Sequence, residues 1–121
     1  MTEFIGVAFI SGKFRGSNHW QIHLNVLKAE AVVPKLIGLG YIPYCPHLIT
    51  ANLQGHFSDD VFLDMCLAYI RKMNPKTDVM FMLKGWRSSR GAVEEYYLAR
   101  ELGITIMGEG DYEPTIKSMP S

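Results

Sequence analysis

The chain has 121 residues, the size of a single domain with one core of ordinary size. Hydrophobic residues make up 48% of it and charged residues 20%, which is typical of a globular protein rather than a disordered one. Twelve basic and twelve acidic residues give a formal net charge of zero, so we expect no broad surface for polymeric nucleic acid. Any phosphate that the protein binds must be held locally.

The sequence also argues against a membrane partner. No apolar run approaches the roughly 18 residues of a membrane span. The start of the chain, MTEFIGVAFISG, lacks the basic residues of a signal peptide, so we expect an intracellular, cytoplasmic protein. Cys45 and Cys66 fall in or beside apolar segments, and we expect buried thiols rather than a disulfide.

The first third of the chain predicts a strand, a loop and a helix. Residues 4–10 are apolar enough for a strand buried on both faces, and the small polar residues 11–17 form the loop that follows. An amphipathic helix is expected to begin near Asn18 and to end by Gly40. Pro34 cannot donate to the carbonyl of a preceding turn, so the helix should kink or break there.

The middle of the chain predicts an edge strand, a long loop and a second helix. Residues 41–45 form the strand, and Pro43 within it favours the edge of the sheet. The polar stretch 46–57 is expected to be a loop of the kind that closes over a site. Ser58 then caps a helix that has Asp59 and Asp60 in its first turn.

The last part of the chain predicts two more strands around a helix, followed by a tail. The strands are residues 79–83 and 104–107. We expect the tail, residues 108–121, either to be partly disordered or to pack on a neighbouring subunit through Tyr112 and Ile116. The alternation of strands and helices predicts a three-layer α/β fold of the Rossmann or flavodoxin-like kind, with a parallel sheet of four to five strands.

The stretch 84–103, KGWRSSRGAVEEYYLARELG, changes from loop to helix near Gly91, where unpaired backbone N–H groups favour anions. At about 100° per residue, two opposite faces of the helix can be assigned. One carries Ala92, Glu95, Ala99 and Leu102, and the other carries Arg90, Glu94, Tyr97 and Glu101. Glu95 therefore faces the protein and Glu94 faces water. An inward carboxylate is unfavourable unless it is paired or used.

Several other chemistries find little support. His19 and His23 have i, i+4 spacing, but no CxxC or HExxH motif accompanies them, so we expect no metal site. A Cys–His hydrolase built on Cys45 and His47 would need a thiolate that nothing in the sequence favours. The GxGxxG and Walker patterns are absent, so we expect no cofactor.

Carboxylate chemistry remains. Glu95 could attack a sugar C1 while a second carboxylic acid, Asp64 or Asp78, assists the leaving base, as in retaining glycosyl transfer. Asp64 lies off the apolar face of its own helix, so its position alone predicts a solvated carboxylate. Arg15 offers a bidentate fork, although its loop could equally be a plain polar connection. Trp86 could stack on a flat base or simply be packed.

Four segments carry a resemblance to a known family: ISGKFRG, YCPHL, FLD and GWRSSRGAVEEYYLARELGI. Over residues 1–107 the chain resembles the nucleoside 2-deoxyribosyltransferase-like proteins, and within them the short DUF4406 branch. The most specific element has the spacing S-x-G-x-x-x-E-x-x-x-A and consists of Ser89, Gly91, Glu95 and Ala99.

The resemblance implies roles for single residues. Glu95 takes the place of the nucleophile, and Asp64 that of the aspartate that contacts the base. Ser89 resembles the serine of the deoxynucleoside 5′-monophosphate N-glycosidases, and His47 would line the same pocket. The loop residues Gly12, Arg15 and Gly16 resemble the phosphate-side loop of those hydrolases. From the helix pattern, Asn25 should also lie near the strand-end site.

The leading expectation is an N-glycosidase or deoxyribosyltransferase acting on a (deoxy)nucleoside or a nucleoside 5′-monophosphate. Its expected catalytic residues are Glu95 and Asp64. Its expected substrate-binding residues are Gly12, Arg15, Gly16, Asn25, His47, Trp86, Ser89 and Gly91. A non-catalytic nucleotide-binding or nucleotide-sensing module is the alternative, and an interaction domain with a vestigial site is a third. The resemblance and the tail favour a homo-oligomer, a dimer or larger.

Overall fold

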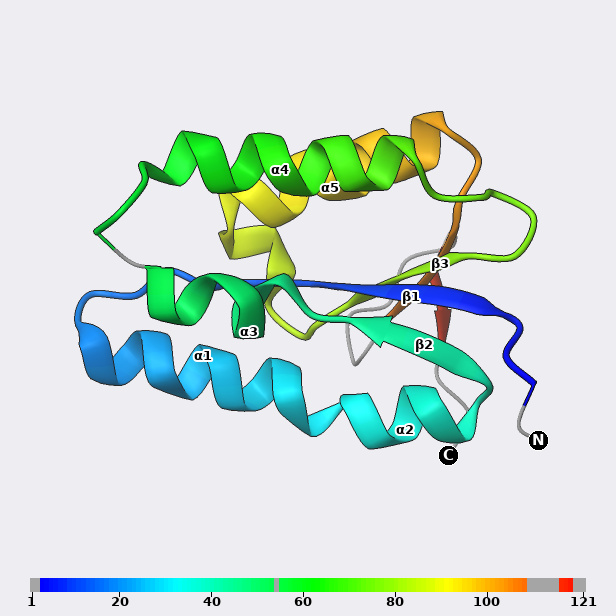
Figure 1. Ribbon diagram of the computed structural model, residues 1–121, viewed down its shortest axis with the longest axis horizontal. Helices are drawn as coiled ribbons and strands as arrows, with labels where there is room; N and C mark the ends of the chain where they lie inside the picture. The colour runs from blue at the N-terminus through cyan, green and yellow to red at the C-terminus, as the bar shows by residue number, and fades with distance from the viewer. Residues whose placement is uncertain (1–2, 54, 109–115, 119–121) are drawn as a thin grey trace.

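The structure is a computed structural model that describes residues 3–53, 55–108 and 116–118. Its strands form one parallel sheet in the order β2-β1-β3-β4-β5 (Figure 1). They are β1 (Gly6–Ser11), β2 (Tyr41–Tyr44), β3 (Val79–Met82), β4 (Thr105–Gly108) and β5 (Ile116–Ser118). The strand order of the flavodoxin-like folds is the same, so the predicted three-layer α/β fold is confirmed.

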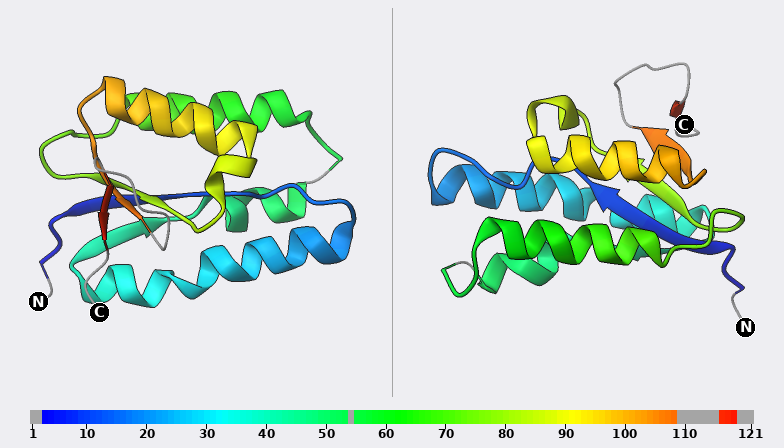
Figure 2. Two further views of the ribbon diagram at one scale, coloured as in Figure 1. Left: turned by 180° about the vertical axis from the view of Figure 1, so that it is seen from behind. Right: turned by 90° about the horizontal axis from the view of Figure 1, so that it is seen from above.

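Helices cover both faces of the sheet (Figure 2). One face carries α1 (His19–Ala31) and α2 (Val33–Gly38), and the other carries α4 (Asp59–Arg71) and α5 (Arg90–Glu101). The short α3 (Pro46–Thr50) and the 3-10 turn η1 (Ala51–Leu53) follow β2, and a second 3-10 turn, η2 (Trp86–Ser88), precedes α5.

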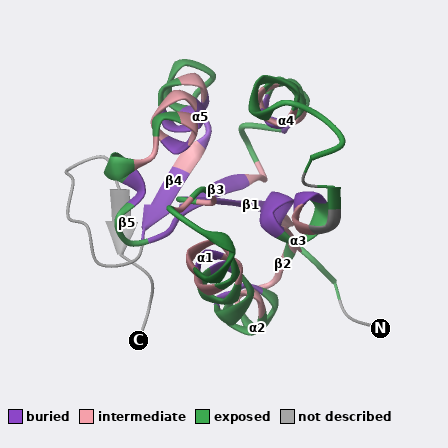
Figure 3. Cartoon of the chain, turned by 90° about the vertical axis from the view of Figure 1, so that its left-hand side faces the viewer, coloured by how far each residue is buried: buried purple, intermediate pink, exposed green. Residues whose placement is uncertain are grey.

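The core is divided by the sheet into two halves because successive strand residues point to opposite faces. Phe9 and Met80 pack under α4 and α5, whereas Ile10 and Phe81 pack over α1 and α2. Figure 3 shows the buried strands between exposed outer helix faces. The near-continuous apolar runs in β1 and β3 are thus explained by burial on both sides.

Two local predictions from proline are confirmed. The first helix breaks at Val32, so that Pro34 lies in the first turn of α2, where its missing N–H is not needed. Pro43 lies in β2, which is an edge strand paired only with β1 among the described residues. Ser58 occupies the N-cap position of α4, as predicted, but its side chain makes no capping hydrogen bond.

One other prediction needs correction. The stretch 46–57 is not a simple loop, because Pro46 occupies an early helical position and starts α3. The tail contributes β5, which pairs with β4 through Ile106 and Ile116, and packing of the tail on a neighbouring subunit stays a prediction. Tyr112 lies outside the described residues. None of the described helices has the length and apolar character needed to cross a membrane.

Candidate active site

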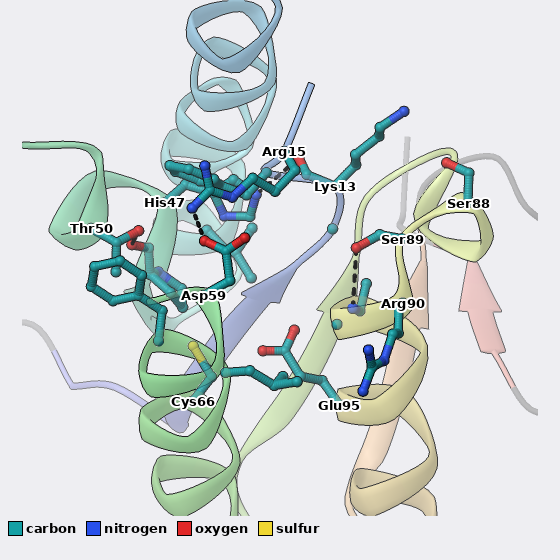
Figure 4. Close-up of a pocket in the computed structure, with 18 of the residues that line it drawn as sticks. Lys13, Arg15, His47, Thr50, Asp59, Cys66, Ser88, Ser89, Arg90 and Glu95 are labelled. Atoms are coloured by element: carbon teal, nitrogen blue, oxygen red, sulfur yellow. Dashed lines mark hydrogen bonds and ion pairs between the residues drawn. The ribbon is translucent and has the colours of Figure 1, made fainter. Parts of the chain in front are cut away.

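A cavity of about 370 Å³ opens at the carboxyl ends of β1 and β3 (Figure 4). The chain leaves β1 toward α1 on one face of the sheet and leaves β3 toward α5 on the other. This divergence is the switch point at which ligands bind in parallel α/β sheets. The walls of the cavity are the loop between β1 and α1, the short helix α3, the first half of α4 and the start of α5.

Glu95 lies in the wall of this cavity and is buried, with 7% of its surface exposed. Its Oε1 accepts a hydrogen bond of 2.8 Å from the Ser11 hydroxyl, and the Cys66 thiol faces the same carboxylate as a weaker donor. Burial raises the pKa of Glu95 to about 7, although both donors lower the pKa and the charge of Glu94 raises it. A large part of this group is therefore protonated at neutral pH.

Glu94 occupies the opposite environment, one residue earlier on the same helix. Its side chain is 39% exposed and pairs with Arg90, one turn earlier, at 3.5 Å. Tyr97 and Glu101 on the same face are exposed. The predicted division is confirmed for Glu95 and Glu94, which differ by about 100° of rotation, but Leu102, which was assigned to the Glu95 face, is exposed at the C-cap of α5.

The start of α5 forms the floor of the cavity beside Glu95. Ser89 is the N-cap residue, and its hydroxyl accepts from the backbone N–H of Ala92 at 3.3 Å. Ser89 and Gly91 both line the cavity, as expected. The backbone N–H groups of this helix start give the cavity a partial positive charge.

The loop from Gly12 to Asn18 forms the roof. A Cβ on Gly12 would lie 2.7 Å from Leu83, so only glycine lets this loop pass so close to β3. Asn25 on α1 is buried, and its Nδ2 donates to the carbonyls of Phe14 and Arg15 at 3.1 Å each. Neither Asn25 nor Gly16 lines the cavity; Asn25 instead holds the loop that does.

Arg15 forms an ion pair with Asp59 across the mouth of the cavity. The pair joins the β1–α1 loop to the first turn of α4, and both side chains are about half exposed. Asp60 also lines the cavity. The sequence indicated these two aspartates only as residues that suit a helix start, because pairing with Arg15 depends on the tertiary fold.

His47 on α3 is buried in the cavity wall, as expected. Its Nε2 lies 3.2 Å from the Lys13 carbonyl oxygen, which assigns the ring proton to Nε2. Its Nδ1 is buried without a hydrogen-bond partner among the described residues. Burial lowers the pKa of His47, so the ring is neutral at pH 7, with Nδ1 as an acceptor.

Three predicted site residues lie elsewhere. Asp64 is exposed on α4 and does not line the cavity, because it lies about 100° around the helix from Leu63, which does. Asp78 precedes β3 at the opposite end of the sheet and accepts from Val7 N at 2.9 Å. Trp86 is buried against Tyr96, with ring centroids 4.5 Å apart, so the packed alternative holds for it.

Two chemistries that the sequence disfavoured were a metal site and a Cys–His hydrolase. In the described part of the chain, no three His, Cys, Asp or Glu side chains converge as a metal site requires. Cys45 and Cys66 are both free and buried, as expected. Burial raises the pKa of the Cys45 thiol, which disfavours the thiolate that a Cys–His hydrolase needs.

The fold and the cavity define an α/β protein with a cavity at the switch point of a parallel sheet and a buried carboxylate, Glu95, on the helix α5 that forms one wall of it. The chain belongs to the family described as "Domain of unknown function (DUF4406)", whose model matches residues 7–108. That range contains every residue that lines the cavity. No curated protein and no solved structure matches the chain.

Proposed function

We propose that this protein is an N-glycosidase or deoxyribosyltransferase that cleaves the N-glycosidic bond of a (deoxy)nucleoside or nucleoside 5′-monophosphate. The proposal also assigns its family to the nucleoside 2-deoxyribosyltransferase-like superfamily. One observation carries it: Glu95, buried in the cavity wall with a pKa of about 7, is the residue at the nucleophile position of the resemblance. Burial removes water that would otherwise solvate this carboxylate and weaken it as a nucleophile.

In the proposed reaction, a carboxylate oxygen of Glu95 forms a bond to C1′ while the bond from C1′ to the base nitrogen breaks. The electron pair of that bond leaves with the base. Water, in hydrolysis, or the nitrogen of a second base, in transfer, then attacks C1′ and releases the Glu95 carboxylate. The covalent intermediate divides one difficult step into two easier ones.

The leaving base needs a proton, and Asp64 is poorly placed to supply it because it lies outside the cavity. Two other carboxylates line the cavity with Glu95. Asp59 is paired with Arg15, so Asp60 is the proposed acid. Both aspartates lie in the first turn of α4 and line the cavity.

The remaining groups suit a sugar and its phosphate. Arg15, Ser89 and the backbone at the start of α5 are proposed to bind phosphate or sugar hydroxyls, because they combine a fork donor with unpaired N–H groups. Phe14 and the neutral His47 ring, 5.5 Å apart between centroids, offer an apolar wall for the base.

The test is chromatographic detection of free base after incubation with a panel of deoxynucleosides and their 5′-monophosphates. Wild-type protein should release base from at least one substrate, and Glu95→Gln should release none. Glu94→Gln is the matched control, because it removes the neighbouring carboxylate on the solvent face and should keep activity. Equal base release by wild-type protein and Glu95→Gln would disprove the nucleophile role.

A non-catalytic nucleotide-binding or nucleotide-sensing module is the second candidate. It is favoured by the exposure of Asp64, which leaves the cavity without the base-contacting aspartate that the resemblance implied. Under this alternative, nucleotides raise the unfolding temperature of wild-type protein and of Glu95→Gln alike, and no product appears with either. Thermal-shift measurements beside the base-release assay separate the two candidates.

A further inference from the structure

We infer that Ser11 and Cys66 are positioning residues that together hold the Glu95 carboxylate in place from two sides. The inference rests on the proposed function for its catalytic meaning, but the contacts themselves stand without it. Ser11 lies within the segment ISGKFRG but received no role from the sequence, and Cys66 lies outside all four segments that carry the resemblance.

Ser11 is fixed more firmly than a loop serine would be. It is the last residue of β1, it is 1% exposed, and its backbone carbonyl accepts from the N–H of Leu83 at 2.8 Å. Its hydroxyl donates to Glu95 Oε1 at 2.8 Å, although the two residues are 84 positions apart in the chain. The central strand of the sheet therefore anchors one oxygen of the carboxylate.

Cys66 approaches Glu95 from α4, the helix packed beside α5. Figure 4 shows Cys66 on α4 and Glu95 on α5 on opposite sides of the base of the cavity, and the thiol makes a side-chain hydrogen bond to the carboxylate. The thiol is 7% exposed and lines the same cavity. Burial and the charge of Glu95 raise the pKa of this thiol, so it keeps its proton and acts as a donor rather than as a nucleophile.

Two donors on one carboxylate have a physical consequence. A buried carboxylate without donors takes up a proton and becomes a weak nucleophile. Donors from Ser11 and Cys66 favour the charged form and restrict rotation of the carboxyl group. The first of these effects opposes burial, which raises the pKa of Glu95.

Other charged or titratable groups face Glu95 and would also affect its titration. On its own helix the nearest is Glu94, whose charge raises the pKa of Glu95. Arg90 on the same helix also lines the cavity, and the other elements around it contribute Lys13, Arg15, His47, Asp59 and Asp60. The variants below leave all of them unchanged, so a shift in the titration of Glu95 reports on Ser11 or Cys66.

The experiment is a carbon-13 NMR titration of the glutamate side-chain carboxyls in the free protein, with Glu95→Gln to assign the Glu95 signal. Ser11→Ala and Cys66→Ala should each raise the midpoint of Glu95, by about one pH unit for Ser11→Ala and less for Cys66→Ala. Cys66→Ser retains a donor and should restore a midpoint near the wild-type value.

Two controls match the variants in chemistry. Ser88→Ala removes a cavity hydroxyl that donates to the Gly85 carbonyl at 2.9 Å, and Cys45→Ala removes a buried thiol from the opposite half of the core. Both should leave the Glu95 midpoint unchanged. If Ser11→Ala does not fold, Cys66→Ala and Cys66→Ser decide the matter.

Unchanged midpoints in the alanine variants that fold, or an equal shift in Cys66→Ser and Cys66→Ala, would overturn the inference. The titration uses no substrate, so its outcome is independent of the base-release assay. Absence of base release from wild-type protein would therefore count against the proposed function and not against these contacts.

Discussion

At the scale of single residues, Glu95 and Glu94 show how helix rotation separates two identical side chains. One turns into the cavity wall and has a pKa raised to about 7, and the other pairs with Arg90 in solvent. If Glu95 is the nucleophile, kcat/KM should rise with pH as the carboxylate forms, with an acid limb near pH 7. A pH profile measured on an active substrate checks this, and a limb near pH 4.5, the ordinary value for glutamate, would contradict it.

The same pKa predicts how stability changes with pH. The folded state holds the Glu95 proton more tightly than the unfolded chain, whose glutamate has its ordinary pKa of 4.5. This contribution is fully present below pH 4.5 and is lost as the pH rises through about 7. Glu95→Gln has no carboxyl group to ionise, so its free energy of unfolding relative to wild-type protein should rise by up to about 3 kcal/mol between pH 4 and pH 8.

Urea unfolding at pH 4 and pH 8 measures this difference. The stability of Glu95→Gln relative to wild-type protein should increase between the two pH values. Glu94→Gln, which changes an exposed carboxylate, should show no comparable change. An equal difference between Glu95→Gln and wild-type protein at both pH values would show that Glu95 is not the buried acid described here.

At the scale of elements, the β1–α1 loop depends on one amide. Asn25 donates to two carbonyls of this loop, and Asn25→Ala leaves both without a partner. We expect a stability loss of about 1–3 kcal/mol and roughly tenfold weaker nucleotide binding, because a looser loop must be ordered on binding. Isothermal titration calorimetry measures the second effect.

The control for Asn25 lies on the same helix. Asn18→Ala removes the N-cap, where the side chain accepts from Gln21 N at 2.8 Å, and should cost about 1 kcal/mol of stability. It touches neither of the two loop carbonyls. If Asn18→Ala weakens binding as much as Asn25→Ala does, general destabilisation explains both results and the loop-holding role is wrong.

The ion pair between Arg15 and Asp59 predicts a variant that binds nucleotides more tightly, whereas Asn25→Ala should bind them more weakly. A phosphate that binds Arg15 must compete with Asp59, so Asp59→Asn should tighten the binding of nucleoside monophosphates by roughly two- to fivefold at low salt. Binding of the corresponding nucleosides should be unaffected. Asp60→Asn is the control, because Asp60 is an adjacent residue that also lines the cavity. If both variants bind monophosphates equally more tightly, the change in net charge explains the effect and the ion pair does not.

Elements with a strong local signal could be predicted from the sequence, and short ones could not. The strands, the break near Pro34 and the edge position of β2 follow from apolar runs and from what proline cannot do. The helix α3 has five residues and β5 has three, which is too short for either to show periodicity.

The same limit applies to the site. Helix geometry correctly predicts that Glu95 points inward and that Asp64 points outward. Only the resemblance placed Asp64 in the site. The contact between Ser11 and Glu95 joins residues 84 positions apart, and no local pattern encodes it. The pairing of Arg15 with Asp59 is hidden for the same reason.

At the scale of the whole molecule, the cavity exists because the chain leaves β1 and β3 toward opposite layers. The two helical layers separate at that edge, and the carboxyl ends of the central strands deliver Ser11 and the start of α5 to the same place. A parallel sheet with this strand order therefore supplies the position of the site, while Glu95 supplies its proposed chemistry.

The most direct test of that chemistry is to trap the covalent intermediate. Wild-type protein mixed with an active substrate and quenched in acid is digested with trypsin, which cuts after Arg90 and Arg100 and yields a peptide containing both Glu94 and Glu95. Mass spectrometry should find the mass of one deoxyribosyl group on this peptide, placed on Glu95 by fragmentation. Sugar found on Glu94 instead, or continued base release with no sugar on this peptide, would contradict the account.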